Sequence, residues 1–320
     1  MSGLYIVWKS ECFRSAQTAY VLNYSIEYVY PPSSLIWSRN VAFRYLYCSV
    51  KTIGLLAFRR PSELSLLNQP FLLAAIAVFY GLVARVPVIL DCHSKVYDPE
   101  YPALLRRFYR WASRNVVVNI NHNVDDSRIV QSYGGESVII SSIPFRLPVS
   151  HVTEATSKGY VFCVCSFAAD EPLNVIIDAA RGVDAAFYIT GNYRKRADEL
   201  VHVPDNVRLL GFVEATEYYG LMQSAGVVLT LSNRSRIMQM AVEEALVLGV
   251  PVVTNFSPVL QSVLPNGGTF VELDGSAVAE GIKTALSNQE TLRAGVVADK
   301  EAQMARVWAA LQNVKRHLEG

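Results

Sequence analysis

The sequence has few cysteines, very little net charge and no long hydrophobic run, and each of these absences excludes a class of protein. The five cysteines show no Cys-x-x-Cys spacing, so we expect reduced thiols in a cytoplasmic protein rather than a disulfide framework or a zinc site. A formal charge of +1 gives no electrostatic case for binding nucleic acid. The start of the chain lacks the pattern of a signal peptide. The most apolar segment, residues 71–84, is too short to span a bilayer and predicts a core helix.

What the sequence does contain is a repeated alternation of short apolar runs with helical stretches. Its 320 residues, 51% of them hydrophobic, are enough for two domains. In the first half we expect strands at residues 4–8, 26–30, 64–67, 88–90, 116–120 and 138–141, and helices at residues 14–22, 41–58, 71–84, 104–112 and 124–133. This alternation is typical of a doubly wound α/β sheet.

The alternation is interrupted by residues 144–158, which hold two prolines and no apolar period and therefore predict a linker. Beyond it we expect strands at residues 160–165, 186–190, 207–210, 227–231, 252–254 and 269–271, and helices at residues 173–181, 217–224, 238–248, 276–287 and 289–318. The sequence thus predicts two Rossmann-like doubly wound domains, residues 1–143 and 159–320, facing each other across a cleft that is the default ligand site. The last helix could pack back on the first domain.

The stretch from Val227 to Asn255 is the clearest functional candidate in the second half. It predicts a buried strand, a polar loop, a helix and a second buried strand, which together form a βαβ unit. In parallel sheets ligands bind beyond the carboxyl ends of the strands, so the loop and the first turns of the helix are where chemistry is expected. The polar residues placed there are Arg234, Arg236, Gln239, Glu243 and Glu244.

Three motifs in this half resemble glycosyltransferase family 4, whose members have the two-domain GT-B fold. They are ITGNYR at residues 189–194, NVRLLGFV at residues 206–213 and EALVLGVPVV at residues 244–253, the last similar to the family's EAM/L-x-x-G-x-P-V-V segment. Members often carry two glutamates separated by seven residues; Glu244 matches the second, whereas Arg236 stands at the position of the first. The loop with Arg234 and Met238-Gln239 resembles a bacterial subset of such transferases.

The chemistry of a nucleotide diphosphosugar agrees with this resemblance. Glu244 could accept hydrogen bonds from both ribose hydroxyls, and the amides near Met238 and Gln239, with the helix dipole, favour a diphosphate. The guanidinium of Arg234 could stabilise the charge on the leaving diphosphate. A solvated helix residue and a surface loop charge are the alternatives for Glu244 and Arg234. Two further donor-binding candidates, expected beside the base, are Gly211 and Phe212.

The remaining site candidates follow other strand ends. Gly191 and Arg194 lie after the strand at 186–190, where Arg194 could replace the basic residues that the family carries after the first strand of this domain; a solvated loop is the alternative. Arg14 and Ser15 stand where many members carry a glycine-rich loop, and could contact phosphate.

At the end of the strand at 88–90, His93 could hydrogen-bond the donor sugar or the acceptor, with Asp91 fixing its tautomer; a histidine satisfied in the domain interface is the alternative.

These observations predict a cytoplasmic glycosyltransferase that moves a hexose from a nucleotide diphosphosugar to a saccharide or lipid-linked saccharide, in surface polysaccharide or glycoconjugate synthesis. The resemblance implies retention of configuration and a metal-independent reaction, and no Asp-x-Asp lies in a suitable loop, so we expect no metal and no cofactor. The helix at 41–58, with Arg59 and Arg60, is aromatic and basic enough to rest on an anionic inner membrane face, although an ordinary packed helix has the same features. A nucleotide-sugar epimerase or hydrolase of this fold, and a catalytically silent partner of another transferase, are alternatives that the sequence leaves open.

Overall fold

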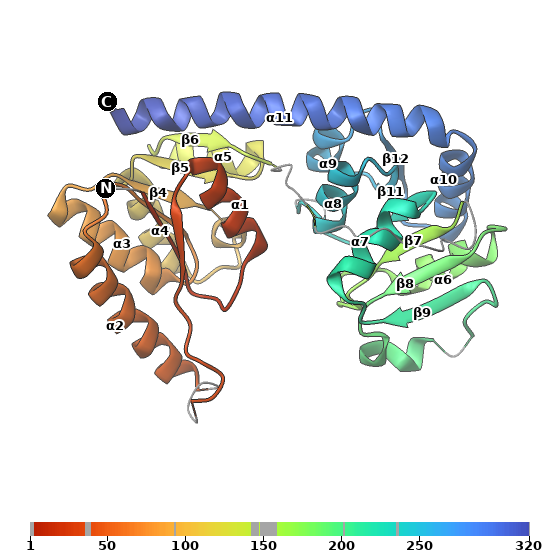
Figure 1. Cartoon of the computed structure of the whole chain (residues 1–320), viewed down its shortest axis with the longest axis horizontal. Helices are drawn as coiled ribbons and strands as arrows, with labels where there is room; N and C mark the ends of the chain where they lie inside the picture. Colours follow the sequence, from red (N-terminus) through yellow and green to blue (C-terminus); the bar gives the residue numbers. More distant parts are fainter. Residues whose placement is uncertain are drawn as a thin grey trace. The chain divides into compact units, whose positions relative to one another are not determined.

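The computed structural model describes residues 3–35, 40–92, 94–141, 147, 159–200, 202–234 and 237–319 (Figure 1). The chain divides into two compact units, residues 1–143 together with 306–320, and residues 144–305. The linker predicted at 144–158 lies outside the described residues except for Leu147. His93 and Arg236 lie outside them as well.

The first unit is built on a six-stranded parallel sheet. Its strands are β1 (Leu4–Val7), β2 (Ser25–Tyr28), β3 (Leu64–Leu67), β4 (Val88–Asp91), β5 (Val118–Asn121) and β6 (Ser137–Ile139), in the order β2-β1-β3-β4-β5-β6. Its helices are α1 (Phe13–Leu22), α2 (Val41–Arg59), α3 (Phe71–Ala84), α4 (Ala103–Arg114) and α5 (Val124–Ser132), with a short 3-10 helix, η1 (Ser94–Tyr97). The order reverses between β1 and β3, which makes this pair the switch point of the sheet.

Both faces of this sheet are covered, which explains why its strands read as continuous apolar runs. Leu4, Ile6, Leu64 and Leu66 point to the side of α2, α3 and α4, where they pack with Leu56, Ala77 and Tyr109. Their neighbours alternate to the other side. There Tyr5 and Val7 pack on Ala19 of α1, while Ile89, Val118 and Ile120 pack on the end of the last helix.

The second unit repeats this plan with strands β7 (Val161–Val164), β8 (Phe187–Thr190), β9 (Val207–Gly211), β10 (Val227–Leu229), β11 (Val252–Asn255) and β12 (Gly268–Val271). All neighbours are parallel and the order is β12-β11-β10-β7-β8-β9, so the switch point lies between β7 and β10. The connecting helices are α6 (Leu173–Arg181), η2 (Tyr193–Glu199, a 3-10 helix), α7 (Ala215–Ser224), α8 (Met240–Leu248), α9 (Pro258–Val263) and α10 (Gly275–Ser287).

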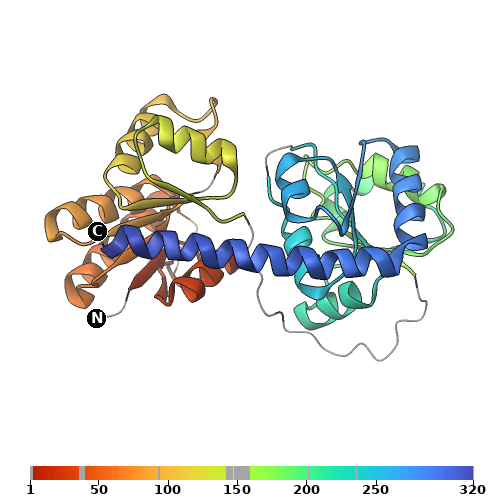
Figure 2. The same ribbon diagram turned by 90° about the horizontal axis from the view of Figure 1, so that it is seen from above.

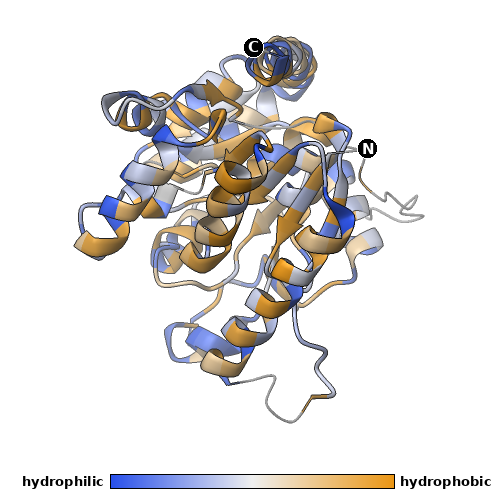
Figure 3. Ribbon diagram, turned by 90° about the vertical axis from the view of Figure 1, so that its left-hand side faces the viewer, coloured by the Kyte–Doolittle hydropathy of each residue, from blue (hydrophilic) through white to orange (hydrophobic). Residues whose placement is uncertain are grey.

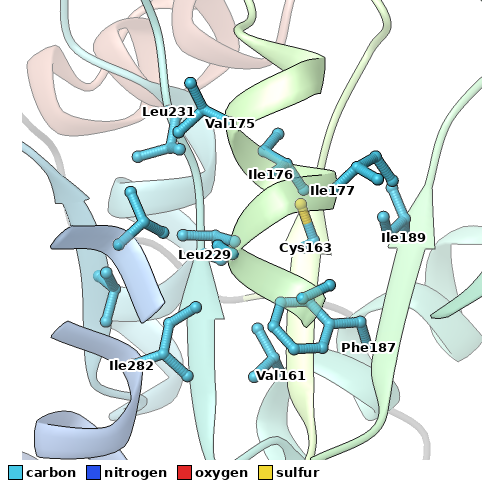
Figure 4. Packing of buried hydrophobic residues seen from close by; sticks show 14 of the residues in the cluster. Val161, Cys163, Val175, Ile176, Ile177, Phe187, Ile189, Leu229, Leu231 and Ile282 are labelled. Carbon is cyan, nitrogen blue, oxygen red and sulfur yellow. The ribbon is translucent and has the colours of Figure 1, made fainter. Parts of the chain in front are cut away.

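The core of the second unit has the same two-sided form. On one face Val161, Cys163, Phe187 and Leu229 pack against α6 and Ile282 of α10 (Figure 4). On the other face α7, α8 and α9 cover the sheet. Each fully buried aliphatic side chain of this kind contributes about 1.5–3 kcal/mol relative to exposure. The sheet is therefore a rigid platform for the loops at its carboxyl edge.

The last helix, α11 (Gln289–Glu319), contributes to both units. Its first half belongs to the second unit, where Arg293 donates to the carbonyls of Ala225 and Gly249. Its end belongs to the first unit (Figure 2), and its Leu311 and Val314 share a core cluster with buried residues of β4, β5 and β6. The first unit is thus completed by a segment that follows the second unit in the sequence.

The structure confirms the predicted pair of Rossmann-like sheets. All predicted strands and helices are present, with ends displaced by one or two residues in most cases, and the helix at 173–181 has the predicted bounds. The helices η1, η2 and α9 were not predicted as helices, because each is short and lacks an apolar period. Among the described residues, α2 is long and apolar enough to cross a membrane by length and composition, with a mean hydropathy of 1.3, whereas α3 is shorter.

Candidate active site

The loops after β7 and β10 lie side by side because these two strands are neighbours at the switch point of the second sheet. Their backbones are joined by a hydrogen bond from Asn233 N to Asp170 O of 2.7 Å. The carboxylate of Asp170 accepts from the Ser232 hydroxyl at 3.0 Å and lies 4.0 Å from Nε of Arg234. Asp170 thus fixes the loop that carries Arg234, whose own side chain is largely exposed.

The loop after β7 is shaped by Glu171. Its carboxylate accepts from the backbone N–H groups of Ser166 and Ala168 at 3.1 and 2.9 Å. The resemblance places ligand-binding basic residues in this loop, whereas here an acid binds the loop's own backbone. Arg196, in η2, donates to the carbonyl of Glu171 at 2.7 Å and forms an ion pair with Glu199. In the basic segment after β8, Arg196 therefore stabilises the loop after β7, whereas Arg194 is exposed.

Gly191 joins the loop after β8 to both neighbouring strand ends. Its N–H donates to the carbonyl of Gly211 at 2.8 Å. Its φ is +113°, and a Cβ there would lie 1.8 Å from the carbonyl oxygen of Cys165. Only glycine fits this position, because the backbone of the loop after β7 passes against it.

Glu244 lies just after the first turn of α8 and is buried. One carboxylate oxygen accepts from the Tyr218 hydroxyl at 2.7 Å and the other from the Tyr219 hydroxyl at 3.3 Å. Burial raises the pKa of the Glu244 carboxyl above its ordinary value, and the two tyrosine hydrogen bonds offset part of that rise. A carboxylate has about four lone-pair sites, so two remain for further donors.

The residue before α8, Gln239, is also buried. Its Oε1 accepts from the Thr230 hydroxyl at 2.6 Å, while its buried Nε2 has no hydrogen-bond partner among the described residues. The side chain does not cap the helix. Val242 N donates to the Gln239 carbonyl at 3.0 Å, so among the described residues the N–H groups of Met240 and Ala241 are the ones that α8 keeps for another partner. Met238 packs on the core of this unit.

The two candidates at the end of β9 differ in exposure. Gly211 adopts a positive φ and accepts the hydrogen bond from Gly191 described above. Phe212 is 89% exposed, which leaves its ring free to stack on a flat ligand.

In the first unit Asp91 is fully buried at the end of β4. Its Oδ2 accepts from the hydroxyls of Tyr5 at 2.8 Å and Thr18 at 2.9 Å, and its Oδ1 lies 3.7 Å from the guanidinium of Arg14. Arg14 also donates to the carbonyl of Ile140 at 3.2 Å. These contacts join α1 to the sheet. The predicted relation of Asp91 to His93 stays a prediction, because His93 is outside the described residues.

The same network accounts for the two residues predicted to contact phosphate at the start of α1. Ser15 is fully buried and its hydroxyl accepts a hydrogen bond of 3.4 Å from Tyr5. Arg14 points inward to Asp91, with only 15% of its side chain exposed. In this arrangement both side chains contact the protein interior, and their contact with phosphate stays a prediction.

Sequence reasoning missed the partners that hold the candidate site together. Asp170, Tyr218 and Tyr219 carry no motif, and their roles depend on contacts with residues 62, 26 and 25 positions away in the chain. A signal was present in the adjacent pair of tyrosines on a helix preceding the EA motif, since a buried carboxylate requires donors. Among the described residues no group of three or more His, Cys, Asp or Glu could hold a metal ion.

The fold and the candidate site at the carboxyl edge of the second sheet point to a class of protein. Residues 158–288 match the family model described as glycosyl transferases group 1. Together with the two doubly wound parallel sheets of the GT-B fold, this match over the second unit supports a glycosyltransferase.

The chain was also compared with individual known proteins and solved structures. No curated protein sequence matches the chain. Among solved structures, HepE of Anabaena in complex with UDP and glucose is 12% identical with a TM-score of 0.72, covering 100% of this chain and 99% of its own. Sucrose-phosphate synthase of Thermosynechococcus elongatus is 14% identical with a TM-score of 0.72, covering 98% and 97%. A putative UDP-N-acetylglucosamine 2-epimerase of Listeria monocytogenes is 11% identical with a TM-score of 0.64, covering 99% and 96%. At these identities the likeness shows the fold alone.

Proposed function

We propose that this glycosyltransferase moves a hexose from a nucleotide diphosphosugar to a saccharide acceptor, with retention of configuration and without a metal, in the synthesis of a surface polysaccharide or glycoconjugate. The observation that carries the proposal is the placement of Glu244 and the free amides of α8 beside the switch point of the second sheet. The family 4 resemblance supports it in the details of mechanism.

Glu244 is suited to the ribose of the donor. Its carboxylate is held by Tyr218 and Tyr219 through one bond to each oxygen, so its orientation is fixed while lone pairs remain available. A pair of vicinal hydroxyls is the natural partner for a carboxylate with one free site on each oxygen. Because the group is buried, each such hydrogen bond is stronger than it would be in water.

The start of α8 is suited to the diphosphate. Its amide donors and helix dipole favour an anion, and Arg234, positioned by Asp170, can stabilise the charge that develops on the departing nucleotide diphosphate. The buried Nε2 of Gln239 adds a donor that has no partner within the part of the chain that the structure describes. The acceptor hydroxyl oxygen bonds to C1 of the hexose as the bond from C1 to the diphosphate breaks, and the acceptor proton passes to the departing diphosphate. No side chain needs to act as a nucleophile in this scheme, since stabilisation of the leaving group lowers the barrier.

The donor can be tested by calorimetry with UDP, GDP, ADP and TDP sugars. Uridine donors come first because HepE has been solved with UDP-glucose. We expect one nucleotide class to bind, with at least a tenfold loss in Glu244→Ala, which removes the ribose acceptor. Glu280→Ala, an exposed acid on α10, is the matched control and should bind as wild type. Binding that is unchanged in Glu244→Ala would refute the site.

A nucleotide-sugar epimerase is the second candidate, favoured by the likeness to the Listeria protein. The two functions differ in their need for an acceptor. An epimerase or hydrolase converts its donor alone, whereas a transferase turns over efficiently only with an acceptor present. Analysis of the products formed from the bound donor without acceptor therefore separates them, and the absence of turnover under all conditions would indicate a silent partner.

We also propose that the acceptor is lipid-linked and that α2 contacts the inner face of the cytoplasmic membrane. Cys48, Thr52 and Leu56 bury one side of α2 on the sheet. The other side exposes 65% of Leu46 and 55% of Ile53. Figure 3 colours the ribbon by the hydropathy of each residue. The flanking cations are Lys51, Arg59 and Arg60. An apolar stripe with basic flanks is the pattern of a helix that lies on anionic lipid.

Sedimentation with vesicles containing an anionic phospholipid tests this contact. The double variant Leu46→Gln with Ile53→Gln should lose most of the bound fraction. Val124→Gln with Val297→Gln, which changes two exposed aliphatic residues on α5 and α11, should keep it. Equal loss in both variants, or no sedimentation of the wild type, would remove the membrane from the proposal.

A further inference from the structure

A second site lies within the first unit, at the carboxyl edge of its own sheet. A cavity of about 590 Å³ opens there, bordered by residues that follow β1, β2, β3 and β4 and by the facing sides of α2 and α4. Its lining residues are Trp8, Lys9, Tyr30, Arg44, Tyr45, Cys48, Gln69, Pro70, Phe71, Lys95, Tyr101 and Leu105. It therefore occupies the same position in the first sheet, at the switch point between β1 and β3, that the donor site occupies in the second.

All the charged residues that line this cavity are cations. Lys9, Arg44 and Lys95 contribute three cations, and none of the lining residues given above is acidic. Within the part of the chain that the structure describes, no ion pair joins these three cations to a carboxylate. Three unpaired cations around one hollow repel each other, so an anion that enters it relieves an unfavourable charge density.

The rest of the wall is aromatic and held in place. Trp8 donates from Nε1 to the Thr52 hydroxyl at 2.8 Å and meets the Tyr45 ring edge-on at 6.0 Å. Arg44 donates to the Tyr30 hydroxyl at 3.0 Å and lies over that ring, which orients the guanidinium and leaves most of its N–H donors free. Flat apolar walls of this kind suit the faces of sugar rings, while an oriented guanidinium suits phosphate oxygens.

We propose that this cavity is the acceptor site and that it holds a phosphate or diphosphate group of the acceptor between Lys9, Arg44 and Lys95. The inference rests on the proposed glycosyl transfer and names the chemical class of its second substrate as a phosphorylated saccharide. The anion can be carried by a lipid or by a soluble sugar phosphate. Since α2 lines the cavity with Arg44 and exposes its opposite side, a lipid-borne diphosphate is the source that agrees with membrane contact.

Inorganic pyrophosphate is the probe for the shared chemistry, titrated in the presence of saturating UDP so that the donor site is occupied. Tryptophan fluorescence is the readout, because Trp8 lines the cavity and the sequence has no tryptophan between residues 144 and 305, which form the second unit. The variant is Lys9→Gln with Lys95→Gln. Arg107→Gln with Lys315→Gln removes the same net charge from exposed positions of the first unit outside the cavity and is the matched control.

We expect pyrophosphate affinity to fall at least tenfold in Lys9→Gln with Lys95→Gln and less than twofold in the control, since charge-assisted hydrogen bonds are lost only in the former. Equal losses, or no binding by the wild type, would overturn the proposal. Binding of UDP is measured separately, so a failure of the donor site is distinguished from a failure of this one.

The source of the anion is then resolved with phosphatidylcholine vesicles that do or do not contain a long-chain alkyl diphosphate. Recruitment that requires the alkyl diphosphate and is lost in Lys9→Gln with Lys95→Gln supports a lipid headgroup. Pyrophosphate binding without recruitment supports a soluble phosphorylated acceptor. Recruitment that persists in that variant contradicts the cavity as the site.

Discussion

Replacing Asp91 with asparagine tests whether this residue holds the first unit together. Asp91→Asn keeps an oxygen that can accept from Tyr5 and Thr18 but removes the charge that faces Arg14 at 3.7 Å. Removing one partner of a buried ion pair costs about 3–5 kcal/mol, because the other charge is left without compensation. Arg14 is 15% exposed and 3.7 Å away, so we expect a value near the lower limit, about 3 kcal/mol.

The assay is urea unfolding followed by tryptophan fluorescence, which reports on the first unit because the sequence has no tryptophan between residues 144 and 305, which form the second unit. Arg14→Met should restore most of the loss when it is combined with Asp91→Asn, since an apolar residue of similar volume replaces an uncompensated charge. Asp125→Asn, in an exposed pair with Arg128, is the control and should change the unfolding free energy by less than about 1 kcal/mol.

Two results would refute this reasoning. A loss below about 1 kcal/mol in Asp91→Asn would show that Arg14 is solvated well enough to need no partner. A full loss that Arg14→Met fails to restore would show that the hydroxyls of Tyr5 and Thr18 matter more than the ion pair. If Asp91 acted only by orienting His93, the variant would lower kcat while the unfolding midpoint stayed the same.

Two further predictions concern the second unit. Gly191→Ala should destabilise it by at least about 3 kcal/mol, because the positive φ and the contact with the Cys165 carbonyl both disfavour a side chain; circular dichroism should show an earlier transition while the tryptophan midpoint is unchanged. Glu244→Gln should be more stable than wild type at neutral pH, since burial raises the pKa of Glu244 and its ionised form is costly. The wild type should regain stability relative to the variant as pH falls through that raised pKa, and denaturation at several pH values checks this sign; a difference that does not change with pH would contradict it.

Much of the fold could be predicted because its determinants are local. Buried parallel strands appear as short apolar runs, and amphipathic helices such as α6 show an apolar period that fixes both ends. The helix η2 was read as a basic loop because Tyr193–Glu199 is polar and contains a non-helical residue, Arg196. Its Lys195 and Arg196 donate to backbone carbonyls of the loop after β7, and no local pattern reveals such contacts.

The candidate site could be predicted only in part, for the same physical reason. The EA motif placed Glu244 early in a helix beside a strand end, which is a local property. Its partners Tyr218 and Tyr219 are brought to it by the packing of α7 on α8. Asp170 contacts Ser232 because β7 and β10 are adjacent, paired strands. These contacts depend on strand order, so they become visible only when the topology is known.

The two units place different chemistry at equivalent positions, and this difference supports a division of roles. At the switch point of the second sheet the fixed charges are the carboxylates of Asp170 and Glu244, which organise a loop and accept from hydroxyl groups. At the switch point of the first sheet the fixed charges are the cations Lys9, Arg44 and Lys95 around an aromatic cavity. A donor with ribose hydroxyls fits the former and an acceptor with a phosphate fits the latter. Both proposed ligands carry phosphate, so the group that distinguishes the two units is the ribose of the donor: its hydroxyls need the Glu244 carboxylate, and no acid lines the cavity of the first unit.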